Sequence, residues 1–418
     1  MRSLDSVLLE RLDDIRRKGL FRELRRIDSP QSTRIRIQGR DLLNFSSNDY
    51  LGLANHPTLR EAAIHGLNQH GNGSGASRLI CGSLSAHHEL EEALADFKKC
   101  DAAISFSSGY AAAMGAICAL MGKNDIIILD KLVHACIVDA SRLSGAKLRV
   151  FAHNDFASLE RVLLWAQKRV SLSTEPTPPN ILVITESAFS MDGDLAPLKE
   201  IVELKERHGA WLMVDEAHAT GVFGTDRSGL VSSLNLSRRV EVQMGTLGKA
   251  LGSSGGFICG SKTLVDFLVN KARSFIFSTA PLPSVAVASL AGIKLVQSGA
   301  GMELCRNLWN NIETTTRFLR GKGWNPGNSA SAILPLMVGD ESKAIQAFHK
   351  LQAEGIFIPA VRYPTVSLGK ARLRLTLSAA HTKDDLGLLE SALEGLTPPT
   401  QDILTEAQQE NDPDFDET

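Results

Sequence analysis

Short apolar runs alternate with longer helical patterns through the middle of this chain. Each run is apolar on both faces, as expected for strands that are buried between two layers of helices. The clearest runs are residues 102–106, 126–129, 148–151, 181–185, 211–214 and 256–258. Segments with helical periodicity separate them. This alternation predicts an α/β fold that is built on a mostly parallel sheet.

The N-terminal region follows a different pattern. Residues 1–28 are rich in arginine, and their apolar residues recur at helical spacing, which predicts an amphipathic helix. Two short runs, 34–37 and 42–45, flank a Gln-Gly-Arg turn and predict a pair of strands. These elements therefore form a small unit that precedes the central fold.

The C-terminal third predicts a second, smaller unit. Residues 284–297 have the pattern of a long helix, and strand signals follow at 332–338 and 373–378 with helices between them. The last twenty residues are polar and acidic, which is typical of disordered segments. We therefore expect an N-terminal helix with short strands, a large α/β domain, a small α+β domain and a disordered acidic tail, at residues 1–45, 46–283, 284–398 and 399–418.

Composition and charge limit the classes of function. The chain has 418 residues, with 45 Lys and Arg against 47 Asp and Glu, and a formal net charge of −2. Such a balance gives no general attraction for nucleic acid or an anionic membrane. No apolar run is long enough to span a bilayer, and the N-terminus lacks the apolar stretch of a signal peptide. Because the six cysteines are scattered without a CxxC, we expect reduced core cysteines, no metal site and a cytoplasmic location.

A strand that ends in an acid gives the first chemical signal. The apolar run 211–214 leads directly into Asp215, and His218 follows within one helical turn. Open α/β sheets bind ligands at the carboxyl ends of their strands. Asp215 can cap a following helix there, or it can face the ring nitrogen of pyridoxal 5′-phosphate (PLP), which must stay protonated if the ring is to accept electrons. His218 can then contact the phenolic oxygen of the same ring.

A lysine among glycines gives the second signal. Lys249 follows a strand-like run and has a glycine immediately before it and another three residues after it. A lysine can reach solvent from such a turn, but burial would disfavour its ammonium form, and the neutral amine is the nucleophile that forms imines. Thr246 can offer a hydroxyl group to a phosphate. Asp215 and Lys249, in this order and about thirty residues apart, are more specific together than either segment is alone.

Further polar residues follow other predicted strands. Gly109 and Tyr110 stand at a strand-to-helix turn, where free N–H groups and the helix dipole favour an anion such as a phosphate. His134 follows the next strand and can stack on an aromatic ring, although a lone histidine is more often structural. Glu186 and Ser190 follow a third strand. We expect all five residues at one edge of the sheet.

Several sequence blocks resemble the α-oxoamine synthases, a family of PLP-dependent enzymes with the aspartate-aminotransferase fold. The resemblance extends from about residue 15 to about residue 395. Its blocks are NFSSNDYLG at 44–52, GSGASR at 73–78, FSMDGD at 189–194, DEAHATG at 215–221, TLGK at 246–249 and ARLRL at 371–375. Their number and order make the resemblance highly specific.

The resemblance implies roles for individual residues. Lys249 would hold the cofactor as a Schiff base and Asp215 would pair with its ring nitrogen, so that these two residues and His134, stacked on the ring, form the catalytic set. His218 would contact the phenolic oxygen. The rest of the cofactor-binding set is Gly109, Tyr110, Glu186, Ser190 and Thr246. The substrate-binding set is Arg22, Asn48, His134, Thr365 and Arg374, in which Arg374 would hold the amino-acid carboxylate.

The resemblance also implies a reaction and partners. Members of the family condense an amino acid with an acyl thioester and release carbon dioxide. The blocks at 73–78 and 246–256 look most like the branch that uses alanine and a pimeloyl thioester in the biotin pathway, while glycine-using relatives are the alternative. The acyl group can arrive on coenzyme A or on a carrier protein. Because the family's sites form between two subunits, a homodimer is expected.

Two unrelated classes share parts of these motifs. Asp-Glu-Ala-His also occurs in helicases, but the GxxxxGK[ST] phosphate loop that a helicase requires does not occur in the sequence. Residues 252–256 match the GxSxG elbow of α/β hydrolases, with Ser254 as the nucleophile. Such an elbow should open a helix, whereas this run leads into the predicted strand 256–258. The hydrolase is therefore the weaker alternative.

Overall fold

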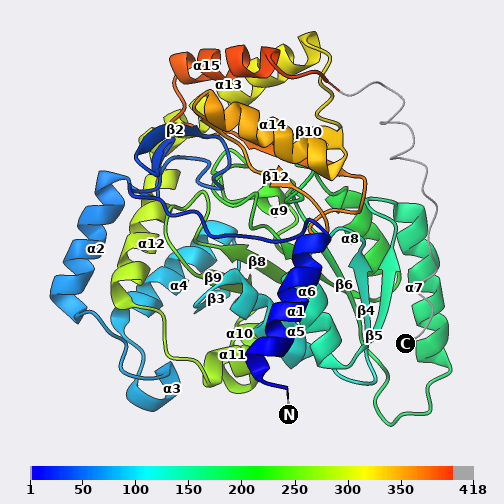
Figure 1. Cartoon of the computed structure of the whole chain (residues 1–418). Coiled ribbons are helices and arrows are strands. Elements are labelled where there is room, and N and C mark those ends of the chain that lie inside the picture. The colour runs from blue at the N-terminus through cyan, green and yellow to red at the C-terminus, as the bar shows by residue number, and fades with distance from the viewer. Residues whose placement is uncertain (1, 399–418) are drawn as a thin grey trace.

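A seven-stranded sheet forms the centre of the molecule (Figure 1). The structure is a computed structural model that describes residues 2–398. Neighbouring strands are parallel except in the two pairs that contain β9. In spatial order the strands are β3 (Ala102–Phe106), β9 (Gly256–Gly260), β8 (Val242–Thr246), β7 (Trp211–Asp215), β6 (Ile181–Glu186), β4 (Ile126–Asp130) and β5 (Lys147–Phe151). The predicted α/β fold with a mostly parallel sheet is confirmed.

Helices cover both faces of this sheet. Successive side chains on a strand point to opposite faces, so each strand presents apolar side chains on both faces, and the helices bury them. Val183 and Leu212 belong to one hydrophobic cluster, whereas Leu182 and Met213 belong to another. The first cluster includes residues of α4 (Ser85–Lys98), α7 (Phe156–Ser171), α8 (Leu198–Arg207) and α12 (Pro283–Gln297). The second includes residues of α5 (Gly109–Leu120), α6 (Ala135–Ser144), α10 (Lys262–Lys271) and α11 (Arg273–Ile276). Three further helices between residues 50 and 283 are α2 (Pro57–His70), α3 (Arg78–Cys81) and α9 (Leu230–Ser233).

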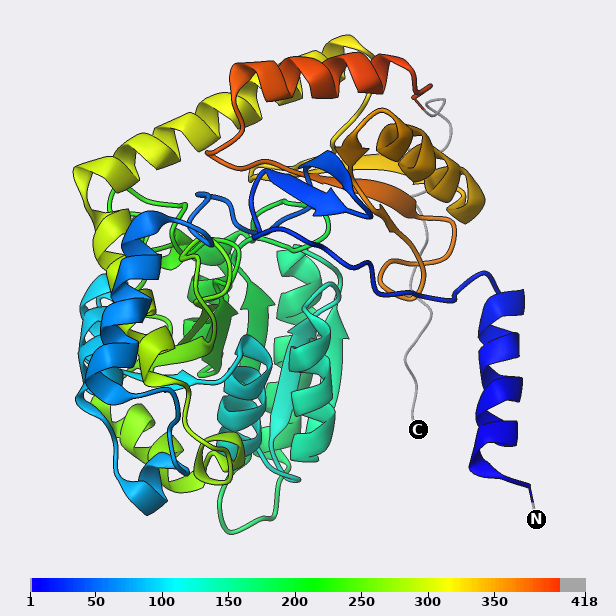
Figure 2. The same ribbon diagram turned by 60° about the vertical axis from the view of Figure 1, so that its left-hand side comes forward.

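Two three-stranded sheets lie beside the main sheet (Figure 2). The first contains β1 (Arg34–Ile37), β2 (Arg40–Asn44) and β11 (Ile356–Phe357), and the second contains β10 (Ile333–Gly339), β13 (Ala371–Thr376) and β12 (Ala360–Val361). The helices of this region are α13 (Gly299–Gly321), α14 (Glu341–Ala353) and α15 (Lys383–Glu394). Because β2 pairs with β11, a strand from the N-terminal region and a strand from the C-terminal third share one sheet.

The N-terminal helix is shorter than the sequence predicted. Helix α1 covers Leu4–Arg17, and the chain turns at Gly19, which has a φ of +65° that glycine adopts without strain. None of the residues of α1 is buried, and the helix stands away from the other elements (Figure 2). The prediction of a helix over residues 1–28 is therefore wrong beyond Arg17. The predicted acidic tail, 399–418, lies outside the described residues.

The six cysteines lie partly in the core and partly nearer the surface. All six cysteines are free, and Cys136, Cys259 and Cys305 are buried. Cys81 is exposed at the end of the four-residue helix α3, so the prediction of a core position is wrong for this residue. Within residues 2–398, no single helix is long and apolar enough to cross a membrane, although the pair α12 and α13, bent by 74°, passes this test by length and composition.

Candidate active site

The predicted site residues follow the ends of several strands at one edge of the main sheet. Strands β3, β4, β6, β7 and β8 run in the same direction, so their carboxyl ends share this edge. Strand β3 leads to Gly109, β4 to His134 and β8 to Lys249, while β6 ends at Glu186 and β7 ends at Asp215. The fold therefore gathers residues that are up to 140 positions apart in the chain.

A continuous line of hydrogen bonds connects Lys249 with Arg374. Lys249 Nζ lies 2.7 Å from His218 Nε2, and Nδ1 of the same ring lies 2.5 Å from the Tyr50 hydroxyl. The Tyr50 hydroxyl donates to Asn48 Oδ1 at 3.3 Å, and this oxygen also accepts from the Arg374 guanidinium at 3.1 Å. The contacts are all satisfied when the neutral His218 ring accepts at Nε2 and donates from Nδ1. The line thus fixes the tautomer of His218.

The electrostatics of this line keep His218 neutral. Burial lowers the pKa of His218 well below its ordinary value, and the positive charges of Lys249 and Arg374 lower it further. Burial also raises the pKa of Tyr50 to about 12, so that its hydroxyl stays protonated and can donate. His218 is therefore suited to accept a hydrogen bond from an amine or a hydroxyl at the position of Lys249 Nζ.

Burial brings the amine of Lys249 closer to its neutral form. It lowers the pKa of Lys249, while the nearby carboxylates of Asp215 and Glu186 act in the opposite direction. Burial likewise raises the pKa of Asp215, which the charge of Lys249 and the N–H of Ala217 oppose. A neutral amine is both a nucleophile and a proton acceptor, and a buried carboxylate is stabilised by a cation that binds beside it. The Lys249 amine therefore suits an aldehyde, and the Asp215 carboxylate suits a protonated ring nitrogen.

The first turn of α5 forms a site that suits an anion. Helix α5 begins at Gly109 immediately after β3 and its turn, and its first N–H groups have no partner within the helix. Gly256 of β9 lies against this turn, since a Cβ at this position would be 2.5 Å from the Ser108 carbonyl oxygen. The Thr246 hydroxyl accepts from the Gly248 N–H at 3.2 Å. This hydroxyl also donates to the Gly255 carbonyl oxygen at 2.8 Å. The free backbone N–H groups of the turn fit the phosphate of PLP, and the contact of Thr246 with the phosphate stays a prediction.

The side chain of Tyr110 contacts helix α6. Its hydroxyl donates to Asp139 Oδ2 on α6 at 2.8 Å, and 49% of the residue is exposed. Only its backbone N–H, in the first turn of α5, is placed for the role that the sequence predicted. The side chain and the backbone of this residue therefore have different uses.

Glu186 and His134 contact each other. The His134 N–H donates to Glu186 Oε1 at 2.6 Å, and the His134 ring accepts from the Cys136 N–H at 3.2 Å as the N-cap of α6. Burial lowers the pKa of His134, which keeps the ring neutral and suited to stacking. In this structure Glu186 therefore holds the backbone of the residue that the sequence placed against the ring.

Four of the five predicted substrate residues are in contact in pairs. Arg374 is buried, and its Nε donates to the Ser190 carbonyl oxygen at 2.6 Å, in addition to its contact with Asn48. Arg22 lies in an exposed pair with Thr365, in which its guanidinium is 3.4 Å from the hydroxyl. The structure therefore pairs Asn48 with Arg374, beside the Ser190 carbonyl, and pairs Arg22 with Thr365.

Tyr50 is the member of the hydrogen-bonded line that sequence reasoning missed. It stands in the block NFSSNDYLG and is only 1% exposed. A tyrosine that follows a run of polar residues just beyond the predicted strand 42–45 was the available signal. Ser254, the nucleophile of the hydrolase alternative, is exposed and precedes strand β9 rather than a helix, so the elbow geometry is missing.

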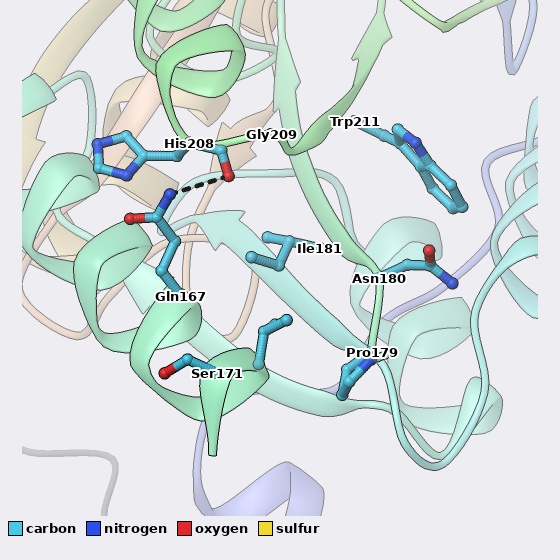
Figure 3. Close-up of a pocket in the computed structure, with 9 residues that line it drawn as sticks. Gln167, Ser171, Pro179, Asn180, Ile181, His208, Gly209 and Trp211 are labelled. Carbon is cyan, nitrogen blue, oxygen red and sulfur yellow. Dashed lines mark hydrogen bonds between the residues drawn. The ribbon is translucent and has the colours of Figure 1, made fainter. Parts of the chain in front are cut away.

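A surface pocket lies at the other end of the same strands (Figure 3). Its volume is about 360 Å³, and it is lined by Ile181 and Trp211, the first residues of β6 and β7. Gln167 and His208 border it, and the Gln167 amide donates to the His208 carbonyl oxygen at 3.3 Å. Because it lies at the amino ends of the strands, this pocket is not part of the site around Lys249.

The fold and the site together define a class of protein. A buried amine, a buried carboxylate, a neutral histidine and a helix N-terminus meet at the carboxyl edge of a mostly parallel sheet. These groups fit the aldehyde, the ring nitrogen, the phenolic oxygen and the phosphate of PLP. The site is that of a PLP-dependent enzyme.

Comparisons with known sequences give the family. The pattern of the family described as aminotransferase class I and II matches residues 40–393. An 8-amino-7-oxononanoate synthase of Geotalea daltonii is 45% identical over 92% of this chain and 96% of that protein. Another, of Thermoanaerobacter pseudethanolicus, is 41% identical over 92% of this chain and 95% of that protein. The chain belongs to the aminotransferase class I and II family.

Solved structures agree with this assignment. Serine palmitoyltransferase of Sphingomonas wittichii has a TM-score of 0.84 and 30% identity, and the match covers 94% of this chain and 99% of that one. A variant of the S. paucimobilis enzyme, with a bound compound of PLP and myriocin, has a TM-score of 0.85 and 29% identity over the same shares. An 8-amino-7-oxononanoate synthase of Francisella tularensis has a TM-score of 0.70 and 26% identity, covering 85% and 98%. The predicted fold, family and cofactor are confirmed.

Proposed function

We propose that this protein condenses L-alanine with a pimeloyl thioester to give 8-amino-7-oxononanoate, carbon dioxide and a free thiol. The observation that carries the proposal is the similarity over more than nine-tenths of the chain to proteins named 8-amino-7-oxononanoate synthase. The hydrogen-bonded line from Lys249 to Arg374 supports it, because it places a base and a carboxylate-binding group at the two ends of one site.

Each residue of the site has a distinct task in this reaction. When bound, PLP supplies a ring that stabilises negative charge on the α-carbon of the amino acid. The amine of Lys249 removes the α-proton, and the Asp215 carboxylate holds the proton on the ring nitrogen. The α-carbon would then bond to the carbonyl carbon of the thioester as the thiol leaves, the bond to the carboxylate would break to release carbon dioxide, and the Lys249 ammonium would return its proton to the α-carbon. His134 would stack on one face of the ring.

Arg374 is proposed to bind the carboxylate of the amino acid. Its Nε donates to the Ser190 carbonyl oxygen, and its Nη1 donates to Asn48 Oδ1. These two contacts hold the planar guanidinium in one orientation. We expect Arg374→Ala to raise KM for alanine by about 10- to 150-fold, because a charge-assisted contact contributes about 1.5 to 3 kcal/mol. Steady-state kinetics with alanine as the varied substrate measure this change. Arg317→Ala, at an exposed arginine that pairs with Glu313, is the control and should leave KM unchanged; an unchanged KM in Arg374→Ala would contradict the role.

The substrates are tested by titrating the PLP-loaded protein. Alanine, glycine and serine are added in turn, the cofactor absorbance is followed, and pimeloyl-coenzyme A or a pimeloyl carrier protein is then supplied. We expect the largest spectral change and a product of the mass of 8-amino-7-oxononanoate with alanine. A product only with glycine would replace the proposal by its glycine-using alternative. The donor that gives the higher kcat/KM identifies the acyl carrier.

A homodimer in the cytoplasm is part of the same proposal. Leu79, Ile80 and Phe277 are exposed by 52%, 80% and 71%. Their segments lie close together, because the Ala280 N–H donates to the Ala76 carbonyl oxygen at 3.1 Å. Clustered exposed apolar residues favour a subunit interface, and free cysteines suit a reducing compartment.

A further inference from the structure

Three charged side chains beside the site are not used by the proposed mechanism. His153 follows β5, Asp130 ends β4 and Asp194 lies in the loop that follows β6. His153 Nδ1 lies 2.9 Å from Asp130 Oδ1, and His153 Nε2 lies 2.8 Å from Asp194 Oδ2. Because β5, β4 and β6 are neighbours in the sheet, one imidazole connects the segments that follow three adjacent strands.

This imidazole is positively charged at neutral pH. Each ring nitrogen faces a carboxylate oxygen, so the doubly protonated ring donates two charge-assisted hydrogen bonds. Burial lowers the pKa of His153, but the hydrogen bonds and charges of Asp130 and Asp194 outweigh it and raise the pKa to about 10. Asp130 is itself held by the N–H groups of Leu132 and Asn154, at 2.8 and 3.1 Å. The cluster is therefore anchored on the side of β4.

Asp194 connects the His153 cluster to the loop at residues 187–197. The Phe189 N–H donates to the Asp194 carbonyl oxygen at 3.0 Å, and the His153 ring packs edge-on against Phe189 with centroids 4.3 Å apart. Ser190 follows directly, and its carbonyl oxygen accepts from Arg374 Nε at 2.6 Å. A short series of contacts thus leads from the charged ring to the guanidinium.

The opposite side of the same loop rests on the smaller sheets. Gly193 has a φ of +72°, and a Cβ there would lie 2.2 Å from the carbonyl oxygen of Ile333 in β10. The Ala330 N–H donates to the Gly193 carbonyl oxygen at 3.0 Å, and Asp192 pairs with Arg372 of β13. The loop is therefore held by the His153 cluster, by the β10–β13 pair and by the Asn154 amide, which donates to Asp194 Oδ2 at 2.9 Å and to the Leu195 carbonyl oxygen at 3.2 Å.

We propose that His153 is a positioning residue for the amino-acid carboxylate: by bridging Asp130 and Asp194 it fixes the loop at 187–197 and so orients Arg374. The inference rests on the proposed role of Arg374 in binding a carboxylate. It does not depend on which amino acid or acyl group the enzyme uses. Loss of a residue that acts in this way should weaken binding of the amino acid and leave binding of the acyl thioester unchanged.

His153→Gln and Asp194→Asn test the bridge. A glutamine amide is neutral and carries both of its donors on one nitrogen, so it cannot place a charged donor against each of the two carboxylates as the ring does. An asparagine at 194 removes one of the two charges that hold the ring. We expect each variant to raise KM for the amino acid about tenfold and to leave KM for the acyl thioester within about twofold. The double variant should lose no more than either single variant, because both remove the same bridge.

Controls separate positioning from general damage. His208→Gln makes the same substitution in a partly buried histidine at the opposite end of the strands, and it should leave both KM values unchanged. PLP content and urea unfolding show whether each variant is folded and loaded. Calorimetric titration with the amino acid alone measures the affinity without turnover, so it remains informative if the proposed reaction is wrong.

The outcomes are distinct. An amino-acid KM and affinity that stay at the parent values in folded, loaded His153→Gln and Asp194→Asn would overturn the inference, as would an equal loss for both substrates. A selective loss of amino-acid binding that is not additive in the double variant would support it. Failure of the parent enzyme to use alanine with a pimeloyl thioester would count against the proposed function alone.

Discussion

Lys249→Ala is expected to lower turnover by at least about five orders of magnitude. The amine is fixed in the site, 2.7 Å from His218 Nε2, so it would act on a bound substrate at a high effective concentration. Groups held in this way reach effective molarities of about 10⁵ to 10⁸ M, which corresponds to about 7 to 11 kcal/mol of the barrier. A free amine in solution cannot replace this contribution.

Two measurements check the expectation for Lys249. Turnover is measured with saturating PLP, and the parent protein is reduced with borohydride and mapped by peptide mass to find the lysine that carries the cofactor. Lys262→Ala, at an exposed lysine that pairs with Asp266, is the matched control and should retain full activity. Retained turnover in Lys249→Ala, or an adduct on another lysine, would contradict the assignment.

Asp215→Asn is expected to slow exchange of the alanine α-proton by about two to four orders of magnitude while PLP stays bound. Asparagine keeps the oxygen that accepts from the Ala217 N–H at 2.8 Å, so the local backbone is preserved. It removes the charge that keeps the ring nitrogen protonated, and positioned acid–base groups of this kind contribute about 10²- to 10⁴-fold. The phosphate contacts, at the start of α5, are untouched.

Loss of deuterium from α-labelled alanine, followed by NMR without any acyl donor, isolates this step. Cofactor absorbance confirms that the variant is loaded. Asp101→Asn, at an exposed carboxylate that pairs with Arg238, is the control. An exchange rate in Asp215→Asn within about threefold of the parent would exclude the proposed role of the carboxylate.

The strands of the main sheet and the site at their carboxyl ends were predictable from the sequence. Buried strands give continuous apolar runs, and the predicted run at 102–106 coincides with β3, while the run at 126–129 is one residue shorter than β4. A polar residue that follows such a run, as Asp215 does, must lie at the sheet edge. Local sequence therefore specifies both the strand and the position of the functional group.

Other features depend on contacts that no local pattern encodes. The end of α1 at Arg17 follows from one glycine in a region where helical periodicity continues, so the periodicity alone was misleading. The contact of Arg374 with the Ser190 carbonyl joins residues 184 positions apart, and it depends on how the smaller sheets pack on the main sheet. Tyr50 was missed for the same reason, since its partner His218 is 168 residues away.

The pairing of β2 with β11 has a consequence for biosynthesis. Strand β2 is made early by the ribosome, but its parallel partner emerges more than 300 residues later. Until then one edge of β2 offers free backbone groups that can pair with other chains. Asn48 and Arg374 likewise come together only once the last strands exist. Assembly of this part of the candidate site is thus delayed until translation is nearly complete, and we expect a chain that stops early to be inactive and prone to aggregate.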